Sequence, residues 1–198
     1  MVALFTPKPT SEDPEESGLP DEFHLLQPEL LRSTFRPPSY AEDNVFTASD
    51  LNLYYDGKHT QWYKRPDWFA VLGVSRFYEQ TELRLSYVTW YEGTYPFVVV
   101  ELISLGTENE DLGRNLREVN QPPNKWTVYE QVLRIPYYFV YNCYTNEPHC
   151  FGLVMNRYQP LSINLTFPVK SKIQQCKLLE ALSGKGLSND SLDRKKIF

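Results

Sequence analysis

Two carboxylates in this 198-residue chain stand beside runs of apolar residues, where an unpaired charge is costly to bury. Asp67 opens the apolar run 68–74, and Glu101 interrupts the run 97–103. Runs of this length, rich in β-branched and aromatic residues, are typical of strands buried on both faces. Two acids on neighbouring strands of one sheet could converge on a divalent metal.

Both acids also have simpler explanations, which the residues alone leave open. An Asp after a proline is most often a turn residue, and a Glu in a strand is often an ion-pair partner. Two carboxylates are also the acid and base of glycosidases. Metal binding separates the metal-dependent hydrolase from the glycosidase alternative.

A short segment directly before Asp67 mixes aromatic and basic residues, as grooves that bind single nucleic-acid strands do. Aromatic side chains at a sheet edge also serve as packing, so both roles stay open. The candidates for nucleic-acid binding in this segment are Trp62, Tyr63, Lys64 and Arg65.

The composition predicts a soluble, cytoplasmic protein with at most a local affinity for nucleic acid. The net charge is −5, so the basic footprint of a general DNA-binding protein is missing. The cysteines are few and irregularly spaced, which favours a reducing compartment over a disulfide scaffold. No signal-peptide pattern and no apolar run of membrane-spanning length is apparent, so no membrane contact is expected.

The chain divides into three parts by composition. Residues 1–20 are rich in Pro, Ser, Glu and Asp and predict a flexible acidic arm. Residues 21–161 hold the apolar patterns of one domain. Residues 162–198 are rich in Lys, Ser and Leu and predict an atypical tail, truncated or disordered apart from one short helix.

The sequence pattern of the domain predicts strands and helices in alternation, without an internal repeat. A first helix, capped by Asp21, is expected at residues 21–35. A helix at 125–133 is expected to turn Val128, Val132 and Leu133 toward a sheet. Strands are expected at 51–55, 68–74, 83–91, 97–103, 136–141 and 150–154, with 83–91 as the middle strand between the two acids.

Three strands, a helix and a further strand, with acids on two strands, describe the core of restriction-endonuclease-like nucleases. The sequence specifically resembles the cyanobacterial Uma-two endonuclease family (the DUF 820 proteins), over roughly residues 19–158. The residues that carry the resemblance are His24, Pro66, Asp67, residues 99–104, Gly106, Thr107, Asp111, residues 125–129 and residues 135–140.

The resemblance implies an α/β fold with a restriction-endonuclease-like core, in which helices flank a mixed central β-sheet. Asp67 and Glu101 would then ligate Mg²⁺ or Mn²⁺, with the Leu102 carbonyl as a third oxygen. Lys125 would position the attacking water or stabilise charge on the phosphate. Tyr129, one helical turn further on, would steady Lys125 or a phosphate, and His24 is a weaker supporting candidate.

The resemblance further implies an endonuclease that acts on DNA, with a homodimer as one assembly such nucleases adopt. One departure is Ile103, which stands where many such nucleases carry the lysine; in this family the lysine lies on the later helix, at Lys125. The alternative from another class is a non-catalytic module that binds nucleic acid or protein and keeps the fold.

Overall fold

The computed structural model describes residues 21–161 apart from Gln80, Leu105, Leu116, residues 118–120 and Asn146. The expected arm at 1–20 and the expected tail at 162–198 lie outside the described residues, as does Cys176. No helix within the described part is long and apolar enough to cross a membrane.

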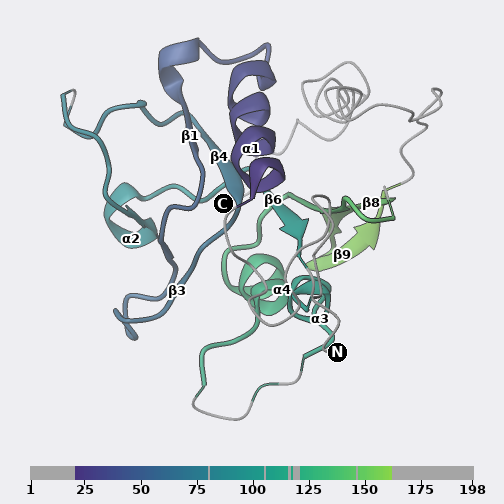
Figure 1. Ribbon diagram of the computed structural model, residues 1–198. Helices are drawn as coiled ribbons and strands as arrows, with labels where there is room; N and C mark the ends of the chain where they lie inside the picture. The colour runs from purple at the N-terminus through teal and green to yellow at the C-terminus, as the bar shows by residue number, and fades with distance from the viewer. Residues whose placement is uncertain are drawn as a thin grey trace, which may run out of the picture.

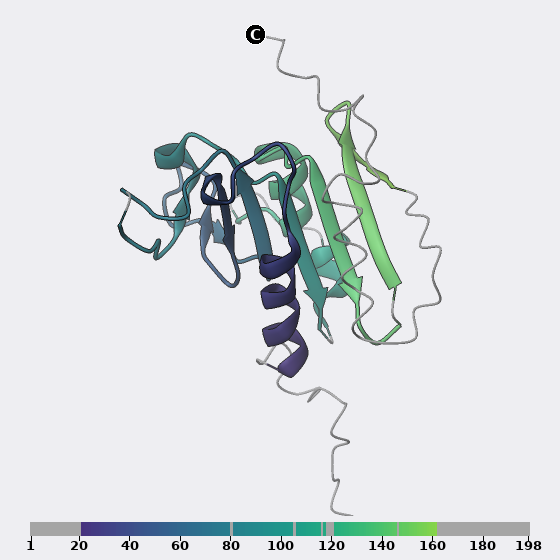
Figure 2. The ribbon, with the colours of Figure 1, turned by 90° about the horizontal axis from the view of Figure 1, so that it is seen from above.

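A six-stranded sheet forms the centre of the molecule (Figures 1 and 2). Strands β6 and β7 run parallel, and the other neighbours pair antiparallel, so the sheet is mixed as predicted. In spatial order, the strands are β1 (Val45–Ala48), β4 (Trp68–Leu72), β6 (Val98–Ile103), β7 (Tyr137–Asn142), β8 (Glu147–Val154) and β9 (Arg157–Pro160).

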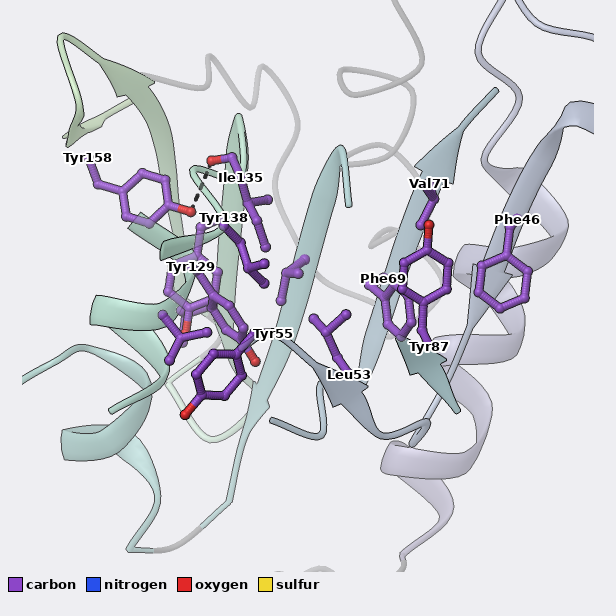
Figure 3. Packing of buried hydrophobic residues seen from close by; sticks show 14 of the residues in the cluster. Phe46, Leu53, Tyr55, Phe69, Val71, Tyr87, Tyr129, Ile135, Tyr138 and Tyr158 are labelled. Carbon is purple, nitrogen blue, oxygen red and sulfur yellow. Dashed lines mark hydrogen bonds between the residues drawn. The ribbon is translucent and has the colours of Figure 1, made fainter. Parts of the chain in front are cut away.

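Both faces of this sheet are covered, which explains why β6 is buried along its whole length. Helix α1 (Glu22–Thr34) lies across one face, where Leu31 and Phe35 pack against the sheet (Figure 2). The other face packs against α4 (Lys125–Thr127), the helical turn η2 (Val128–Val132) and a small sheet (Figure 3). The small sheet consists of β3 (Tyr63–Lys64), β2 (Leu53–Tyr54) and β5 (Tyr87–Val88), in that order.

Helix α1 begins as the sequence predicted. The Asp21 side chain accepts a hydrogen bond from the His24 N–H at 2.7 Å and so caps the helix. Pro28 lies inside the helix and is buried, and the helix continues past it to Thr34. Phe35 follows directly and packs edge-on against Trp68, with 5.4 Å between ring centroids. The cap thus holds the start of α1, and this packing holds its end.

The predicted middle strand at 83–91 is wrong. Strands β4 and β6 pair directly, with Trp68 opposite Val100. Of the predicted stretch, Tyr87 and Val88 form β5 of the small sheet, and α2 (Thr89–Glu92) follows. The Tyr87 ring is fully buried between Phe46 and Phe69, so packing against the face of the large sheet outweighs the local strand pattern (Figure 3).

The predicted helix at 125–133 forms, but it widens after its first turn. Asn124 caps it, since its Oδ1 accepts from the Thr127 N–H at 2.8 Å. From Val128 the chain takes a π-helical turn, in which the Leu133 N–H donates to the Val128 carbonyl at 2.9 Å. Val128 and Leu133 are buried as predicted, whereas Val132 is 42% exposed. The wider turn rotates Val132 away from the sheet.

Several smaller elements differ from the expectation. The strand predicted at 51–55 is confined to β2, and the one predicted at 150–154 begins earlier, as β8. Strands β1, β3 and β9 were not predicted as separate elements, because each is short. Two short helical turns, η1 (Glu42–Asn44) and α3 (Glu108–Asp111), complete the described chain. Cys150 is a buried free thiol.

Candidate functional site

The two predicted carboxylates meet where β4 begins. Because Trp68 pairs with Val100, the preceding Asp67 lies opposite Glu101. The Asp67 N–H donates to Glu101 Oε2 at 3.4 Å. Glu101 is fully buried, and Asp67 is partly exposed. The sheet therefore brings together two acids that are 34 residues apart in the sequence.

The backbone of Leu102 is held from two sides by residues of the site. Its N–H donates to Asp67 Oδ2 at 2.6 Å, and its carbonyl accepts from His24 Nε2 at 3.2 Å. Leu102 lies two residues beyond the last β4–β6 pair, at Val100, so a carboxylate and an imidazole replace the missing strand partner there. The predicted third oxygen thus belongs to a fixed peptide group.

Lys125 reaches the carboxylates from the first turn of α4. Its Nζ donates to Glu101 Oε2 at 3.0 Å and to Asp111 Oδ1 at 2.8 Å. Asp111 lies on α3 and is 1% exposed. Asp111 is among the residues that carry the family resemblance, but the sequence assigned it no role. Only the fold shows that a buried carboxylate, Asp111, lies beside the candidate catalytic lysine.

The short helix α3 also holds the backbone of Lys125. Glu110 Oε1 accepts from the Lys125 N–H at 3.3 Å, while Glu110 Oε2 accepts from Arg117 at 2.6 Å. Gly113 ends this segment at a φ of +69°, and a Cβ there would lie 2.7 Å from the Cβ of Trp126. A glycine is therefore required for the close approach of α3 to α4.

Tyr129 contacts Glu101 rather than the expected Lys125 or a phosphate. Its hydroxyl donates to Glu101 Oε1 at 2.8 Å, and the ring is fully buried. Burial raises the pKa of Tyr129 well above its ordinary value, and the adjacent Glu101 carboxylate raises it further. Tyr129 therefore stays a neutral donor that fixes the orientation of the Glu101 side chain.

The cluster holds three carboxylates and one ammonium. Burial raises the pKa of Glu101 to about 8; Lys125 opposes this shift, and Asp67 and Asp111 add to it. Burial also raises the pKa of Asp67. Burial disfavours the Lys125 ammonium, but the three carboxylates outweigh burial and raise the pKa of Lys125. A bound cation would favour the ionised form of Glu101 and so lower its raised pKa.

The donor atoms fit Mg²⁺ or Mn²⁺. Asp67, Glu101 and the Leu102 carbonyl offer oxygen ligands, which these ions prefer. Asp67 Oδ1 has no hydrogen-bond partner among the described residues. Within the described ranges, no group of three or more His, Cys, Asp or Glu side chains is arranged to hold a metal ion. Two carboxylates and one carbonyl are therefore the donor set to test.

His24 is positioned by Asp21, whose Oδ1 lies 2.9 Å from His24 Nδ1. Burial disfavours its charged form, but the hydrogen bonds with Asp21 and the Leu102 carbonyl outweigh burial and raise the pKa of His24. Ser104 Oγ lies 3.1 Å from Nε2, which gives the contacts of a Ser-His-Asp set. Ser104 is only 4% exposed, and Nε2 needs its proton for the Leu102 carbonyl, so this set does not form a nucleophile and base.

The four residues before Pro66 point in different directions. Trp62 is half-buried and stacks on His59, with 3.9 Å between ring centroids. Tyr63 is 45% exposed. The Lys64 side chain is 11% exposed, and its Nζ lies 3.7 Å from Glu110. Arg65 is exposed and donates to the Asp50 carbonyl. Tyr63 and Arg65 therefore remain accessible to a ligand.

The mixed sheet between helices, with acids of two adjacent strands meeting a lysine, is the arrangement expected of restriction-endonuclease-like nucleases. A sequence model of the Uma2 family, described as "Putative restriction endonuclease", matches residues 13–184. The chain belongs to this family. The match extends on both sides beyond the residues 19–158 that carry the resemblance.

Comparison with solved structures finds a chain described as a "putative nuclease belonging to DUF820", from Anabaena variabilis. The two chains share 11% sequence identity with a TM-score of 0.48, over 79% of this chain and 77% of that one. No curated protein matches the chain.

Proposed function

We propose that the chain is an endonuclease that hydrolyses DNA phosphodiester bonds with Mg²⁺ or Mn²⁺ as cofactor. The observation that carries this proposal is that Asp67 (directly before β4), Glu101 (on β6) and Lys125 (on α4) converge, in a member of the Uma2 family. All three residues implied by the resemblance are present, and hydrogen bonds link them. This retention favours a catalyst over the alternative of a non-catalytic module that keeps the fold.

Each residue then has a role that follows from its contacts. Asp67, Glu101 and the Leu102 carbonyl would hold the ion, and Tyr129 and His24 orient Glu101 and Leu102. When bound, the ion supplies positive charge to the phosphate oxygens and acidifies water. The carboxylates of the site would repel a phosphate, so a bound cation would strengthen substrate binding in addition to its part in the chemistry.

Lys125 acts as a charged donor and not as a base. Its raised pKa keeps the ammonium protonated, because three carboxylates surround it. An ammonium held in place by Glu101 and Asp111 can donate to the attacking water or to a phosphate oxygen. Its backbone is fixed as well, by Glu110, so little reorganisation is required.

The first experiment is calorimetry of Mn²⁺ and Mg²⁺ on the wild type, on Asp67→Asn and on Asp43→Asn. Asp43 is an exposed acid of η1 and serves as the matched control. We expect binding in the wild type and in Asp43→Asn and its loss in Asp67→Asn. Binding that survives Asp67→Asn would place the ion elsewhere and contradict the proposal.

The second experiment measures plasmid cleavage by the wild type and by Lys125→Met. We expect cleavage with either ion, and a loss of cleavage in Lys125→Met while metal binding persists. Metal binding without cleavage of any DNA would favour the non-catalytic module. Hydrolysis of a glycoside without metal would favour the two-carboxylate glycosidase alternative. Cytoplasmic location and a homodimer, expected from the sequence, stay predictions.

A further inference from the structure

The small sheet presents two different faces. Tyr54 pairs with Tyr63 and Leu53 pairs with Lys64, so the residues at these two register positions point to opposite sides. Leu53 and Tyr87, which pair with each other, are fully buried and point into the core (Figure 3). The other side of the small sheet therefore carries Tyr63, Tyr54 and Val88.

This second side, called here the tyrosine face, consists of the side chains of Tyr63, Tyr54 and Val88. Tyr63 is 45% exposed, and Tyr54 and Val88 are half-buried. The two tyrosine rings lie 5.4 Å apart between centroids and are tilted by 51°. Neither hydroxyl has a hydrogen-bond partner among the described residues. The rings are thus accessible aromatic surfaces on two adjacent strands.

Strand β3 joins the tyrosine face to the candidate metal site. Lys64, the next residue after Tyr63, turns inward to Glu110, which also accepts from the Lys125 N–H. Only four peptide units separate Tyr63 from Asp67, which is at most about 14 Å of extended chain. Figure 1 shows β3 beside the end of the molecule where α3 and α4 lie. A nucleic-acid strand bound at Asp67 and Glu101 can therefore reach Tyr63.

The segment that carries the two tyrosines also has a favourable charge. Residues 54–65 contain Lys58, Lys64 and Arg65 against the single acid Asp56, a net charge of +2 in a chain of net charge −5. Lys64 lies 3.7 Å from Glu110 and Arg65 lies 3.6 Å from Asp50, so the exposed side chains of Lys58 and Arg65 are the cations that a phosphodiester backbone can reach. The acidic remainder offers little to the long row of phosphates on a duplex.

We propose that the tyrosine face binds unpaired nucleotides next to the phosphate that is cut, with their bases stacked on Tyr63 and Tyr54. This inference rests on the proposed nuclease function. Every unpaired base exposes an aromatic face, whereas a duplex hides its base faces in the stack. The preferred substrate is therefore a single strand, or a junction or flap with an unpaired segment beside the cut.

The test is fluorescence anisotropy with a short labelled oligothymidylate and a labelled hairpin duplex of equal length, in a chelator so that nothing is cut. Tyr63→Ala should bind the single strand about 5- to 150-fold more weakly, the effect of losing one stacked base. Tyr63→Leu, which keeps bulk without an aromatic ring, should behave alike, and Tyr63→Phe should bind as the wild type does.

Tyr40→Ala is the matched control, since Tyr40 is 39% exposed and lines a pocket with Arg32 and Arg36, at the end of α1 away from His24. It should leave the affinity for the single strand unchanged. Equal affinity of the wild type for hairpin and single strand would overturn the inference, and so would an unchanged affinity in Tyr63→Ala. Absence of any oligonucleotide binding would also overturn it.

The two proposals fail separately. Metal-dependent cleavage that Tyr63→Ala leaves unchanged on single strands refutes the tyrosine face and leaves the nuclease standing. Single-strand binding that is lost in Tyr63→Ala, in a chain that cleaves no DNA, refutes the nuclease and keeps the tyrosine face.

Discussion

Two buried glutamates, Glu101 and Glu130, have opposite electrostatic surroundings. Glu101 is 0% exposed and Glu130 is 3% exposed. Glu130 Oε1 accepts from the Tyr158 N–H at 2.8 Å, and Oε2 accepts from Arg157 at 3.1 Å. Burial acts to raise the pKa of Glu130, but these donors and Gln131 outweigh burial and lower it. At Glu101, burial and two neighbouring acids raise the pKa to about 8.

The difference shows that burial of a carboxylate does not by itself mark a functional site. Glu130 is matched by donors and ties η2 to β9, which is a structural role. Glu101 and Asp111 share the Lys125 ammonium, and no other cationic side chain among the described residues is hydrogen-bonded to Glu101. A raised pKa at a buried carboxylate is a feature of functional sites, and it is found at Glu101 and not at Glu130.

The largest expected effect is on catalysis, from matched Glu→Gln substitutions. Glu101→Gln should lower kcat by about 10²–10³-fold, since it removes a charge at the reaction centre. Glu130→Gln should leave kcat unchanged within experimental error. Plasmid cleavage at saturating Mg²⁺ measures both, and an equal loss in the two variants would erase the distinction between the glutamates.

For stability, we expect the larger loss from Glu130→Gln and not from Glu101→Gln. Glu130→Gln should lower the free energy of unfolding by about 1–2 kcal/mol, because a charge-assisted hydrogen bond becomes a neutral one. Glu101→Gln should not lower it in chelator, because it relieves repulsion from Asp67 and Asp111. Urea unfolding followed by circular dichroism measures both values. Destabilisation of the metal-free protein by Glu101→Gln would speak against an excess of negative charge.

The pH dependence should differ in sign between the two glutamates. The pKa of Glu101 rises from 4.5 to about 8 on folding, so its contribution to stability is complete below pH 4.5 and is lost as the pH rises to 8. The pKa of Glu130 is lowered, so its contribution is present above the ordinary pKa and is lost in acid. Urea unfolding of metal-free wild type and Glu101→Gln across this range should show the wild type losing stability relative to the variant. Parallel profiles would contradict the raised pKa.

The smallest expected effect comes from Asp21→Ala, because Asp21 contacts the candidate metal site only through His24. Loss of the cap should cost about 1 kcal/mol or less in unfolding free energy. The metal affinity should fall by less than about tenfold, because Asp21 acts on the Leu102 carbonyl only through the imidazole. Arg157→Ala, on the Glu130 side, should leave the metal affinity unchanged. Calorimetry with Mn²⁺ distinguishes the two variants.

The sequence by itself determined the parts that depend on local pattern. The apolar runs around Trp68 and Val99 predicted β4 and β6, because a buried strand needs apolar residues on both faces. Asp21 predicted the start of α1, because a short acceptor side chain satisfies the first free N–H groups of a helix. The positions of Asp67 and Glu101 at these strands pointed to one site.

The tertiary structure alone decided which groups meet there. Residues 83–91 have a strand pattern, yet most of them lie outside β5, because burial of Tyr87 against the large sheet governs their position. Asp111 reaches Lys125, and Tyr129 reaches Glu101 across 28 residues, through contacts that no local pattern encodes. Hydrogen bonds between distant segments depend on the packing of whole elements. The charge balance that distinguishes Glu101 from Glu130 therefore appears only once the chain has folded.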